Sequence, residues 1–482
     1  MSEATRPTLE KLLVAAEEAR EPCAALPPGV RAEALRRVAD ALDAAAGDLV
    51  PLAHQETNLP ERPRLHHELE RTTFQLRLLA ETVVEGGYLE VVLDSPDTCW
   101  PAGGRADLRR MLVPVGPVAV FAASNFPFAF SVAGGDTAAA LAVGCPVVVK
   151  ASPGHPLVSD LVGSLVSAAL SSAGVPEGAF GVVHGFEEGR ALVVDPRIRA
   201  GAFTGSLEGG RALFDLACGR PDPIPFYAEL GSVNPVFVTA SAAAERVEGI
   251  AEGYVASFTL GNGQFCTKPG VVFVPAADAP AFESFVEAAL SGQVAEPMLN
   301  DDVADRYAAG LAGLRAHPAV RVLVAGEGTA PTLLGCDATD FLSAREELLT
   351  ECFGPVSMVV RYSSEAELLE CARAFTGELA ASVHGSAPDE TVSRLVAVLT
   401  ERVGRVLWNG WPTGVSVTYA MQHGGPYPAT TSAGHTSVGT TSLRRFLRPV
   451  VYQNMPQALL PEVLRDGNPH GVPRRVDGVP HR

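Results

Sequence analysis

The sequence lacks the patterns by which disulfide frameworks, zinc sites, secretion signals and membrane spans are recognised. Its 482 residues include eight cysteines, but none forms a Cys-x-x-Cys pair and none has zinc-ligand spacing to a histidine. No apolar run reaches the roughly 18 residues that a membrane helix needs, and the N-terminal residues show no apolar signal core. We therefore expect a cytoplasmic protein without a metal ion, in which a reactive cysteine is distinguished only by its surroundings.

Positive charge and aromatic residues are also scarce. The chain has 37 Lys and Arg against 55 Asp and Glu, a net charge of −18, and 6% aromatic residues. Such an acidic chain repels nucleic acids and anionic membranes, so we expect neither as a partner. An anionic substrate or cofactor must then be met by a local positive site. The 47% apolar content is that of a well-buried globular protein.

The hydrophobic pattern predicts an α/β protein. Apolar residues recur at helical spacing over residues 8–90, and these helices are expected to pack on the domain that follows. From about residue 109, short apolar strands alternate with helices, and a second such series begins near residue 226, which predicts parallel sheets covered on both faces. We predict strand structure over residues 111–123 and irregular structure after residue 459.

Cys266 is the candidate nucleophile. It follows the turn-forming run Gly261-Asn262-Gly263-Gln264-Phe265, whose backbone amides can approach a ligand, and it precedes Lys268, whose charge would favour a thiolate. The octapeptide alone is equally compatible with an inert, buried cysteine at a helix end.

Two polar residues are candidates for acid–base and oxyanion roles. Glu229, at a strand end before Gly231, can act as a general base if it faces a cleft. Asn125, just past a strand in Ser124-Asn125-Phe126-Pro127, can donate an amide N–H to an oxyanion. Taken singly, a glutamate at a strand end is usually just solvated, and an Asn-x-Pro turn is common.

A nucleotide site is indicated by a glycine turn between a strand and a helix. Phe203-Thr204-Gly205-Ser206, with Gly210, has the arrangement that places a pyrophosphate on helix N–H groups, although it is not a Gly-x-Gly-x-x-Gly motif. Lys150 ends the apolar strand Pro146-Val147-Val148-Val149-Lys150, in a neighbouring strand–helix crevice.

The order of these motifs along the chain resembles the aldehyde dehydrogenase superfamily, and the resemblance covers nearly the whole chain. Several longer segments resemble, more narrowly, the branch that oxidises α-ketoglutaric semialdehyde (2,5-dioxovalerate) with NADP. The family-wide motifs include Pro114-Val115-Gly116-Pro117, Gly174-Val175-Pro176-Glu177-Gly178 and Glu351-Cys352-Phe353-Gly354-Pro355; the narrower ones are ASNFPFAFSVAGGDTAAALAVGCPVVVK, FYAELGSVNPVF, GNGQFCTKPG, NGWPTG and HGGPYPATT.

The resemblance implies a role for each matching residue. Cys266 is then the nucleophile, Glu229 the general base, and Asn125 the oxyanion donor together with the Cys266 backbone N–H. The residues implied in cofactor binding are Lys150 and Ser152 at the adenosine ribose, Thr204, Gly205, Ser206 and Gly210 at the pyrophosphate turn, and Glu351 and Phe353 at the nicotinamide ribose and ring.

Two departures bear on specificity. Many NAD-preferring members of the family carry a Glu where this chain has Pro153, and the absence of that carboxylate favours NADP, with NAD still possible. In the branch we expect Gly-Val-Glu-Val where this chain has Gly414-Val415-Ser416-Val417, which puts the assigned substrate in doubt if Ser416 lines the substrate tunnel. Arg109, Arg110 and Lys268 are candidates, by position alone, for binding a substrate carboxylate.

The resemblance also implies an architecture of two Rossmann-like domains and a small β element that joins protomers into a homodimer or homotetramer. We assign residues 1–98 and 113–230 to the cofactor-binding domain, 231–433 to the catalytic domain, and 99–112 and 434–482 to the bridging element. Alternatives are a fatty or aromatic aldehyde as substrate, CoA-acylating chemistry, and a non-catalytic binding protein that reuses the fold.

Overall fold

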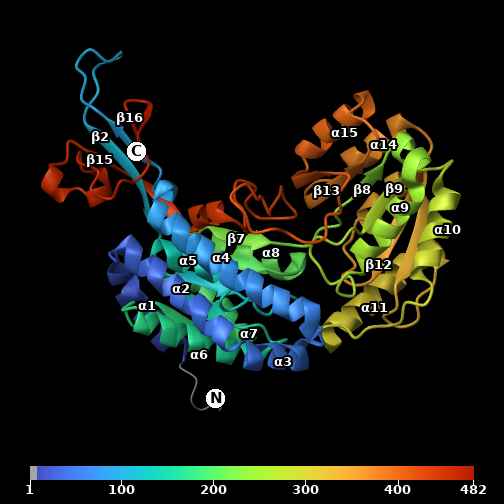
Figure 1. Cartoon of the computed structure of the whole chain (residues 1–482), viewed down its shortest axis with the longest axis horizontal. Coiled ribbons are helices and arrows are strands. Elements are labelled where there is room, and N and C mark those ends of the chain that lie inside the picture. The colour runs from blue at the N-terminus through green and yellow to red at the C-terminus, as the bar shows by residue number, and fades with distance from the viewer. Residues whose placement is uncertain (1–7, 102, 482) are drawn as a thin grey trace.

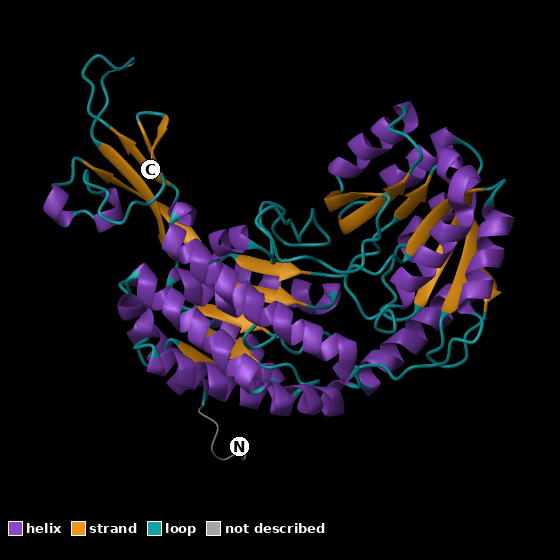
Figure 2. Ribbon diagram, in the orientation of Figure 1, coloured by secondary structure: helices purple, strands orange, loops and turns teal. Residues whose placement is uncertain are grey.

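The computed structural model describes residues 8–101 and 103–481 and is built around three β-sheets (Figure 1). Two sheets are covered by helices and form the two lobes of the molecule, and the third projects from the first lobe as an arm (Figure 2). Among the described residues, no helix combines the length and the apolar character needed to cross a membrane.

The first sheet is parallel, with strand order β5-β4-β3-β6-β7. The chain extends the sheet in opposite directions from β3, so β3 and β6 flank a topological switch point, where ligands bind in open α/β sheets. The elements are β3 (Val118–Phe121), α5 (Gly135–Val143), β4 (Val147–Lys150), α6 (Pro156–Ser172), β5 (Phe180–Val183), α7 (Phe186–Val194), β6 (Ala200–Thr204), α8 (Leu207–Cys218) and β7 (Phe226–Glu229).

The N-terminal helices pack on this lobe, as the sequence predicts. Helix α2 lies against α4 and α6, and α4 also contacts α5, so their apolar faces join one core with the strands of the first sheet. The elements are α1 (Leu9–Ala24), α2 (Pro28–Ala44), α3 (Ala46–Thr57), the π-helical turn η2 (Glu61–Leu65), α4 (His66–Glu85) and the 3₁₀ turn η3 (Gly87–Leu89).

The second sheet has the order β10-β11-β12-β9-β8-β13-β14, and only β10 runs antiparallel to its neighbour. Its central strands are buried on both faces because helices cover both sides. The elements are β8 (Val236–Val238), α9 (Ala240–Thr259), β9 (Val271–Pro275), α10 (Ala279–Leu290), α11 (Asp301–Ala316), β10 (Arg321–Val324), β11 (Thr332–Asp337), α12 (Ala338–Ser343), α13 (Arg345–Leu348), β12 (Val356–Tyr362), α14 (Glu365–Ala374), β13 (Glu378–His384), α15 (Glu390–Thr400) and β14 (Val403–Trp408).

The third sheet, ordered β15-β2-β1-β16-β17, forms the arm. It joins two strands from the first quarter of the chain to strands from its end, and its one parallel pair is β1 with β16. The elements are β1 (Val91–Asp94), β2 (Leu108–Pro114), the 3₁₀ turn η4 (Thr440–Phe446), β15 (Leu447–Gln453), the turns η5 (Gln457–Leu459) and η6 (Glu462–Leu464), β16 (Arg474–Val476) and β17 (Val479–His481).

The structure corrects three sequence predictions. The strand-like run over residues 111–123 is two strands in different sheets, because the chain turns between Pro114 and Pro117, where Gly116 has a φ of 120°. The tail after residue 459 is not wholly irregular, since it supplies β16 and β17. Val91–Asp94, which we assigned to the cofactor-binding domain, pairs with β2 in the arm.

Candidate active site

The segment before Cys266 forms a sharp turn after α9. Gly261, Asn262 and Gly263 all have left-handed φ values, of 58°, 55° and 66°. A Cβ atom on Gly263 would lie 2.2 Å from the carbonyl oxygen of Gly354, so a side chain cannot be accommodated there. The Gly-Asn-Gly sequence is therefore required by a backbone that most residues cannot adopt.

Side-chain hydrogen bonds hold this turn in place. The Asn262 side-chain amide donates to the Glu296 carbonyl at 2.9 Å, and the side-chain oxygen Oε1 of Gln264 accepts from the Leu299 N–H at 2.9 Å. The Asn234 amide donates to the Cys266 carbonyl at 2.9 Å. These bonds fix the position of the Cys266 thiol, which is partly accessible, whereas five of the other cysteines are buried.

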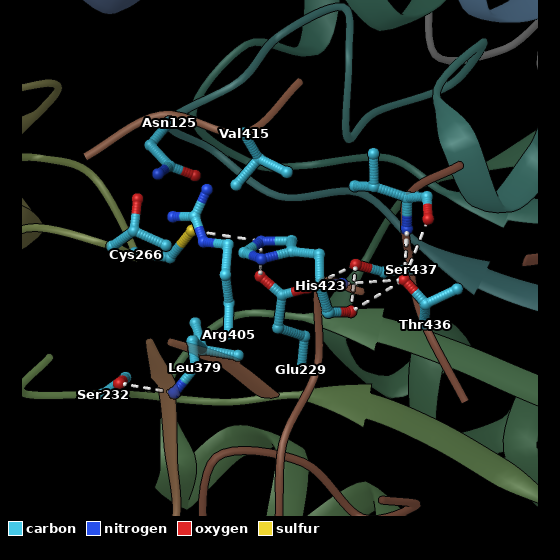
Figure 3. Close-up of polar contacts among 12 residues, drawn as sticks. Asn125, Glu229, Ser232, Cys266, Leu379, Arg405, Val415, His423, Thr436 and Ser437 are labelled. Carbon is cyan, nitrogen blue, oxygen red and sulfur yellow. Dashed lines mark hydrogen bonds and ion pairs between the residues drawn. The ribbon is translucent and has the colours of Figure 1, made fainter. Parts of the chain in front are cut away.

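Cys266, His423 and Glu229 meet in one cluster (Figure 3). His423 Nε2 lies 2.9 Å from Glu229 Oε1 and 3.7 Å from Cys266 Sγ. The Ser437 hydroxyl donates to Glu229 Oε2 at 2.5 Å, and the Ser437 N–H donates to the His423 carbonyl at 2.9 Å. One imidazole nitrogen thus contacts both the thiol and the carboxylate, and Ser437 holds the pair.

The surroundings set the charges of this cluster. Burial opposes ionisation of Glu229, but His423, Ser437 and Cys266 outweigh burial and lower the pKa of this carboxyl. Burial and the negative charges of Glu229 and Glu351 raise the pKa of the Cys266 thiol well above its ordinary value. The resting cluster therefore pairs a carboxylate with a protonated thiol, which needs a base before it can attack a carbonyl.

The three donor atoms lie within 4.8 Å of one another and have the chemistry of a zinc site, although the sequence predicts no metal ion. A tetrahedral Zn²⁺ with ligand bonds of about 2.0–2.1 Å would hold the carboxylate oxygen and the imidazole nitrogen about 3.3 Å apart. The observed 2.9 Å between Glu229 Oε1 and His423 Nε2 is instead the spacing of direct partners.

Asn125 lies beside the nucleophile. It follows β3, and its side-chain amide donates one bond, of 3.0 Å, to the carbonyl of Gln264. The second amide N–H remains for a ligand, because a side-chain NH₂ group carries two donors. Within the part of the chain that the structure describes, the backbone N–H of Cys266 donates to no protein acceptor. Both donors that an oxyanion would need are therefore near Cys266.

Thr204, Gly205, Ser206 and Gly210 lie at the end of β6 and the start of α8. Thr204 pairs with Glu229 on β7, and the Gly205 N–H donates to the Glu229 carbonyl at 3.1 Å. The Ser206 hydroxyl caps α8 by accepting from the Gly209 N–H. Gly205 and Ser206 are exposed, and a Cβ on Gly210 would clash with Leu230. This uncovered helix N-terminus at the switch point fits a dinucleotide pyrophosphate.

Lys150 and Ser152 flank the same crevice but differ in accessibility. Lys150, at the end of β4, is half-buried against Gly189 of α7, and burial lowers the pKa of its ammonium group. Ser152 is fully buried, and its hydroxyl contacts the Ser124 hydroxyl at 2.8 Å and the Gly154 N–H at 3.2 Å. The exposed residue of this turn is Pro153.

Glu351 and Phe353 lie on the opposite lobe. The Glu351 carboxylate touches Gly231, where an added Cβ would lie 2.4 Å from Oε2. Burial raises the pKa of Glu351 to about 7, although Lys268 and the Ser232 N–H oppose this. Phe353 packs against the core of the first lobe. Both residues are therefore close to the junction of the two lobes, and Glu351 lies against the segment that follows Glu229.

The structure shows that the three cations proposed for a substrate carboxylate lie elsewhere. Arg109 and Arg110 belong to β2 in the arm, where Arg109 pairs with Asp107 and Asp466. The Lys268 ammonium donates to the carbonyls of Cys352 and Val356, so it turns away from the thiol. Ser416 is exposed.

Sequence analysis missed His423, Ser437 and Arg405. His423 stood within the motif HGGPYPATT, but nothing local marked it as the partner of a cysteine 157 residues away. Arg405 extends from β14 towards Cys266 and His423 in Figure 3, and its guanidinium donates to the carbonyls of Pro412 and Gly414. Its positive charge offsets part of the rise in the Cys266 pKa.

Comparison with known proteins supports a family assignment. The model of the aldehyde dehydrogenase family matches residues 1–307. An α-ketoglutaric semialdehyde dehydrogenase of Acinetobacter baylyi is 44% identical over 93% of this chain and 87% of the relative. The α-ketoglutaric semialdehyde dehydrogenase 2 of Azospirillum brasilense is 44% identical over 98% of this chain and 92% of the relative.

Solved structures share the fold. A 1-pyrroline-5-carboxylate dehydrogenase from Thermus with bound NAD superposes with a TM-score of 0.78 at 22% identity, covering 92% of this chain and 85% of that one. A 3,6-anhydro-L-galactose dehydrogenase in complex with NAP also has a TM-score of 0.78 at 22% identity, covering 92% of this chain and 91% of that one. With the family match and the 44% identical relatives, these findings confirm the resemblance: the chain belongs to the aldehyde dehydrogenase family, whose members oxidise aldehydes with NAD(P).

Proposed function

We propose that this enzyme oxidises α-ketoglutaric semialdehyde to 2-oxoglutarate with NADP. The observation that carries the chemistry is the cluster in which His423 Nε2 contacts both Cys266 Sγ and Glu229 Oε1. The substrate follows from the 44% identity to two α-ketoglutaric semialdehyde dehydrogenases over nearly the whole chain.

The proposed reaction begins when the Cys266 thiol loses its proton to the His423–Glu229 pair. The sulfur attacks the aldehyde carbon, and the second Asn125 amide N–H and the Cys266 backbone N–H stabilise the oxyanion. Acceptance of a hydride from that carbon is the chemistry that a nicotinamide held by Glu351 and Phe353 would supply, and it would leave the acyl group on Cys266 as a thioester. Glu229 then draws a proton from water, and the water oxygen displaces the sulfur to give the carboxylic acid and a free thiol.

The residues present fit a dinucleotide. The pyrophosphate would lie on the uncovered N-terminus of α8 at Gly205 and Ser206, with Thr204 and Gly210 shaping the turn. Glu351 and Phe353 would hold the nicotinamide ribose and ring.

The preference for NADP rests on what surrounds the adenosine ribose. Pro153 stands where a carboxylate would repel a 2′-phosphate, and Lys150 supplies positive charge nearby. Ser152 is proposed to assist, but its buried hydroxyl is already engaged by Ser124 and Gly154. Specificity for the phosphate therefore depends mainly on Lys150 and Pro153.

A fatty or aromatic aldehyde is the second candidate substrate. The rings of Phe126 and Phe130 lie 5.3 Å apart, and Phe126 also packs edge-on to Phe265 at 5.3 Å, which gives the nucleophile aromatic neighbours. CoA-acylating chemistry is disfavoured, because Glu229 is held as a carboxylate that can activate water.

We propose that the two lobes are the cofactor-binding and catalytic domains and that the arm joins protomers into a homodimer or homotetramer. The edge strand β15 of the arm leaves Val451 and Tyr452 partly exposed, as an intersubunit surface would require. Residues 434–446, which we expected in the bridging element, belong with the candidate active site instead, because Ser437 binds Glu229.

The substrate is tested by steady-state kinetics with NADP and with NAD. We expect kcat/KM for α-ketoglutaric semialdehyde to exceed that for pentanal and benzaldehyde by about 10- to 100-fold, the worth of a charged hydrogen bond. Cys266→Ala should abolish NADPH formation. Equal or better turnover of the uncharged aldehydes would favour a fatty or aromatic aldehyde as the substrate. Formation of acyl-CoA when CoA is added would favour CoA-acylating chemistry.

The cofactor is tested at Pro153. Pro153→Glu should lower the ratio of kcat/KM with NADP to that with NAD by at least about tenfold, because a carboxylate at this position repels the 2′-phosphate. Pro153→Ala is the matched control and should leave the ratio near the wild-type value. An unchanged ratio in Pro153→Glu would show that the phosphate binds elsewhere.

The protonation state of the nucleophile is tested by alkylation with iodoacetamide across pH. In the enzyme without cofactor, labelling of Cys266 should still increase above pH 9, because burial and Glu229 raise the thiol pKa. Glu229→Gln removes the negative charge, lowers the Cys266 pKa and should speed labelling at pH 8 by about tenfold for each pKa unit. The exposed Cys99 and Cys218 are internal controls. Slower labelling in Glu229→Gln would contradict this electrostatic account.

The role of His423 is tested by paired substitutions. His423→Asn should lower kcat/KM by about 10²- to 10⁴-fold, because asparagine can fill the position but cannot take up a proton. His423→Phe should be equally impaired, with melting temperatures near that of the wild type for both. A phenylalanine variant with near-normal turnover would show that the ring serves only to pack against Phe130.

A further inference from the structure

A cavity of about 430 Å³ opens beside the nucleophile loop and is lined by the N-terminal helices. It lies between η2 and α4 on one side and Gly261 and Phe265 on the other, so it reaches the residue before Cys266. Its lining carries three arginines, Arg62, Arg64 and Arg71, against two glutamates, Glu68 and Glu296. In a chain with a net charge of −18, this is a local positive site.

Two of these charges neutralise each other. Arg64 Nη1 lies 2.5 Å from Glu68 Oε2, and the other Glu68 oxygen accepts from the backbone N–H groups of Phe128 and Ala129 at 2.8 and 2.9 Å. Arg64 Nη2 donates to the Asn125 carbonyl at 2.9 Å. Arg64 and Glu68 therefore brace the segment that carries Asn125. Both Glu68 oxygens and both Arg64 Nη atoms are engaged, and only the buried Arg64 Nε has no hydrogen-bond partner among the described residues.

Arg71 has a donor to spare. Its Nε donates to the Val415 carbonyl at 3.5 Å, but its Nη1 is buried and has no hydrogen-bond partner among the residues that the structure describes. A buried, unpartnered guanidinium N–H is costly unless a ligand satisfies it. The Nη1 group of Arg71 is therefore available to donate a hydrogen bond to an anionic ligand.

Arg71 is also close to the reaction centre. Its guanidinium lies over the Phe130 ring at 5.3 Å, and that ring lies 6.2 Å from the ring of His423. Burial lowers the Arg71 pKa, while the negative charges of Glu68 and Glu229 oppose that shift. Arg405, which also lies near Cys266 (Figure 3), is half-buried and is already engaged by the carbonyls of Pro412 and Gly414.

We propose that Arg71 binds the carboxylate at the far end of an aldehyde substrate, so that the enzyme selects aldehydes that carry an acid group from uncharged aldehydes. The Nη1 group would satisfy one carboxylate oxygen, while the aromatic rings of Phe126 and Phe130 contact the carbon chain. This assignment rests on the proposed function, and it names Arg71 as the residue that makes the enzyme specific for aldehydes with an acid group. It also supplies the local positive site that an acidic protein needs for an anionic substrate.

The experiment compares five-carbon aldehydes: glutaric semialdehyde and pentanal differ in the acid group alone, and α-ketoglutaric semialdehyde carries a ketone as well. For the wild type, Arg71→Met and Arg71→Lys, kcat/KM is measured with glutaric semialdehyde, α-ketoglutaric semialdehyde and pentanal. Arg71→Met should lose about 10- to 100-fold in kcat/KM for both acids, mainly through KM, and remain within about twofold for pentanal. Arg71→Lys should retain part of the preference, since it keeps the charge without the planar fork.

Arg77→Met is the matched control, because Arg77 lies on the same helix and pairs at the surface with Asp40 and Asp43. It should keep wild-type kinetics with all three substrates. Two outcomes would overturn the role of Arg71 and leave the proposed substrate standing. One is a preference for acids that survives in Arg71→Met. The other is an equal loss of kcat/KM with the acids and with pentanal in both Arg71 variants. A wild type without any preference for acids would overturn the proposed substrate, and the role of Arg71 with it.

Discussion

The imidazole of His423 lies between a carboxylate and a thiol, 2.9 Å from Glu229 and 3.7 Å from Cys266, and the rest of the molecule brings these groups together. Glu229 ends a strand of the first lobe, and Cys266 follows a helix of the second. His423 comes from the irregular segment after β14, which returns to the first lobe and is held there by Ser437. The proton chemistry therefore depends on the packing of the two lobes against each other.

Much of the fold was predictable because the local signals agree. The apolar strand–helix alternation predicts the sheets of the two lobes. Errors occurred where tertiary context decides. Residues on either side of Gly116 have equal strand character, yet they pair with different partners. The strand β16 is short and polar, and it exists because β1 offers it an edge.

The site was predictable in part for the same reason. Cys266, Glu229 and Asn125 stand in motifs whose order along the chain is informative, and the structure brings them near one another. The arginines near the site were not found from the sequence, because what makes them relevant is their distance in space from Cys266. Lys268 adjoins Cys266 in sequence but faces carbonyls, whereas Arg71 is remote in sequence and packs over Phe130. An unsatisfied donor is visible only once every neighbour is placed.

The bond between Ser437 and Glu229 spans 208 residues, and this has a consequence for synthesis. Every strand of the sheets in the two lobes ends before residue 409, so these strands all precede the segment that carries His423 and Ser437. Contacts between residues so far apart in sequence form late, because the entropy cost of closing the long loop between them comes before any free energy that the contact contributes. A chain that lacks this last segment therefore lacks the imidazole and the hydroxyl that contact Glu229, even if every strand of both lobes is present.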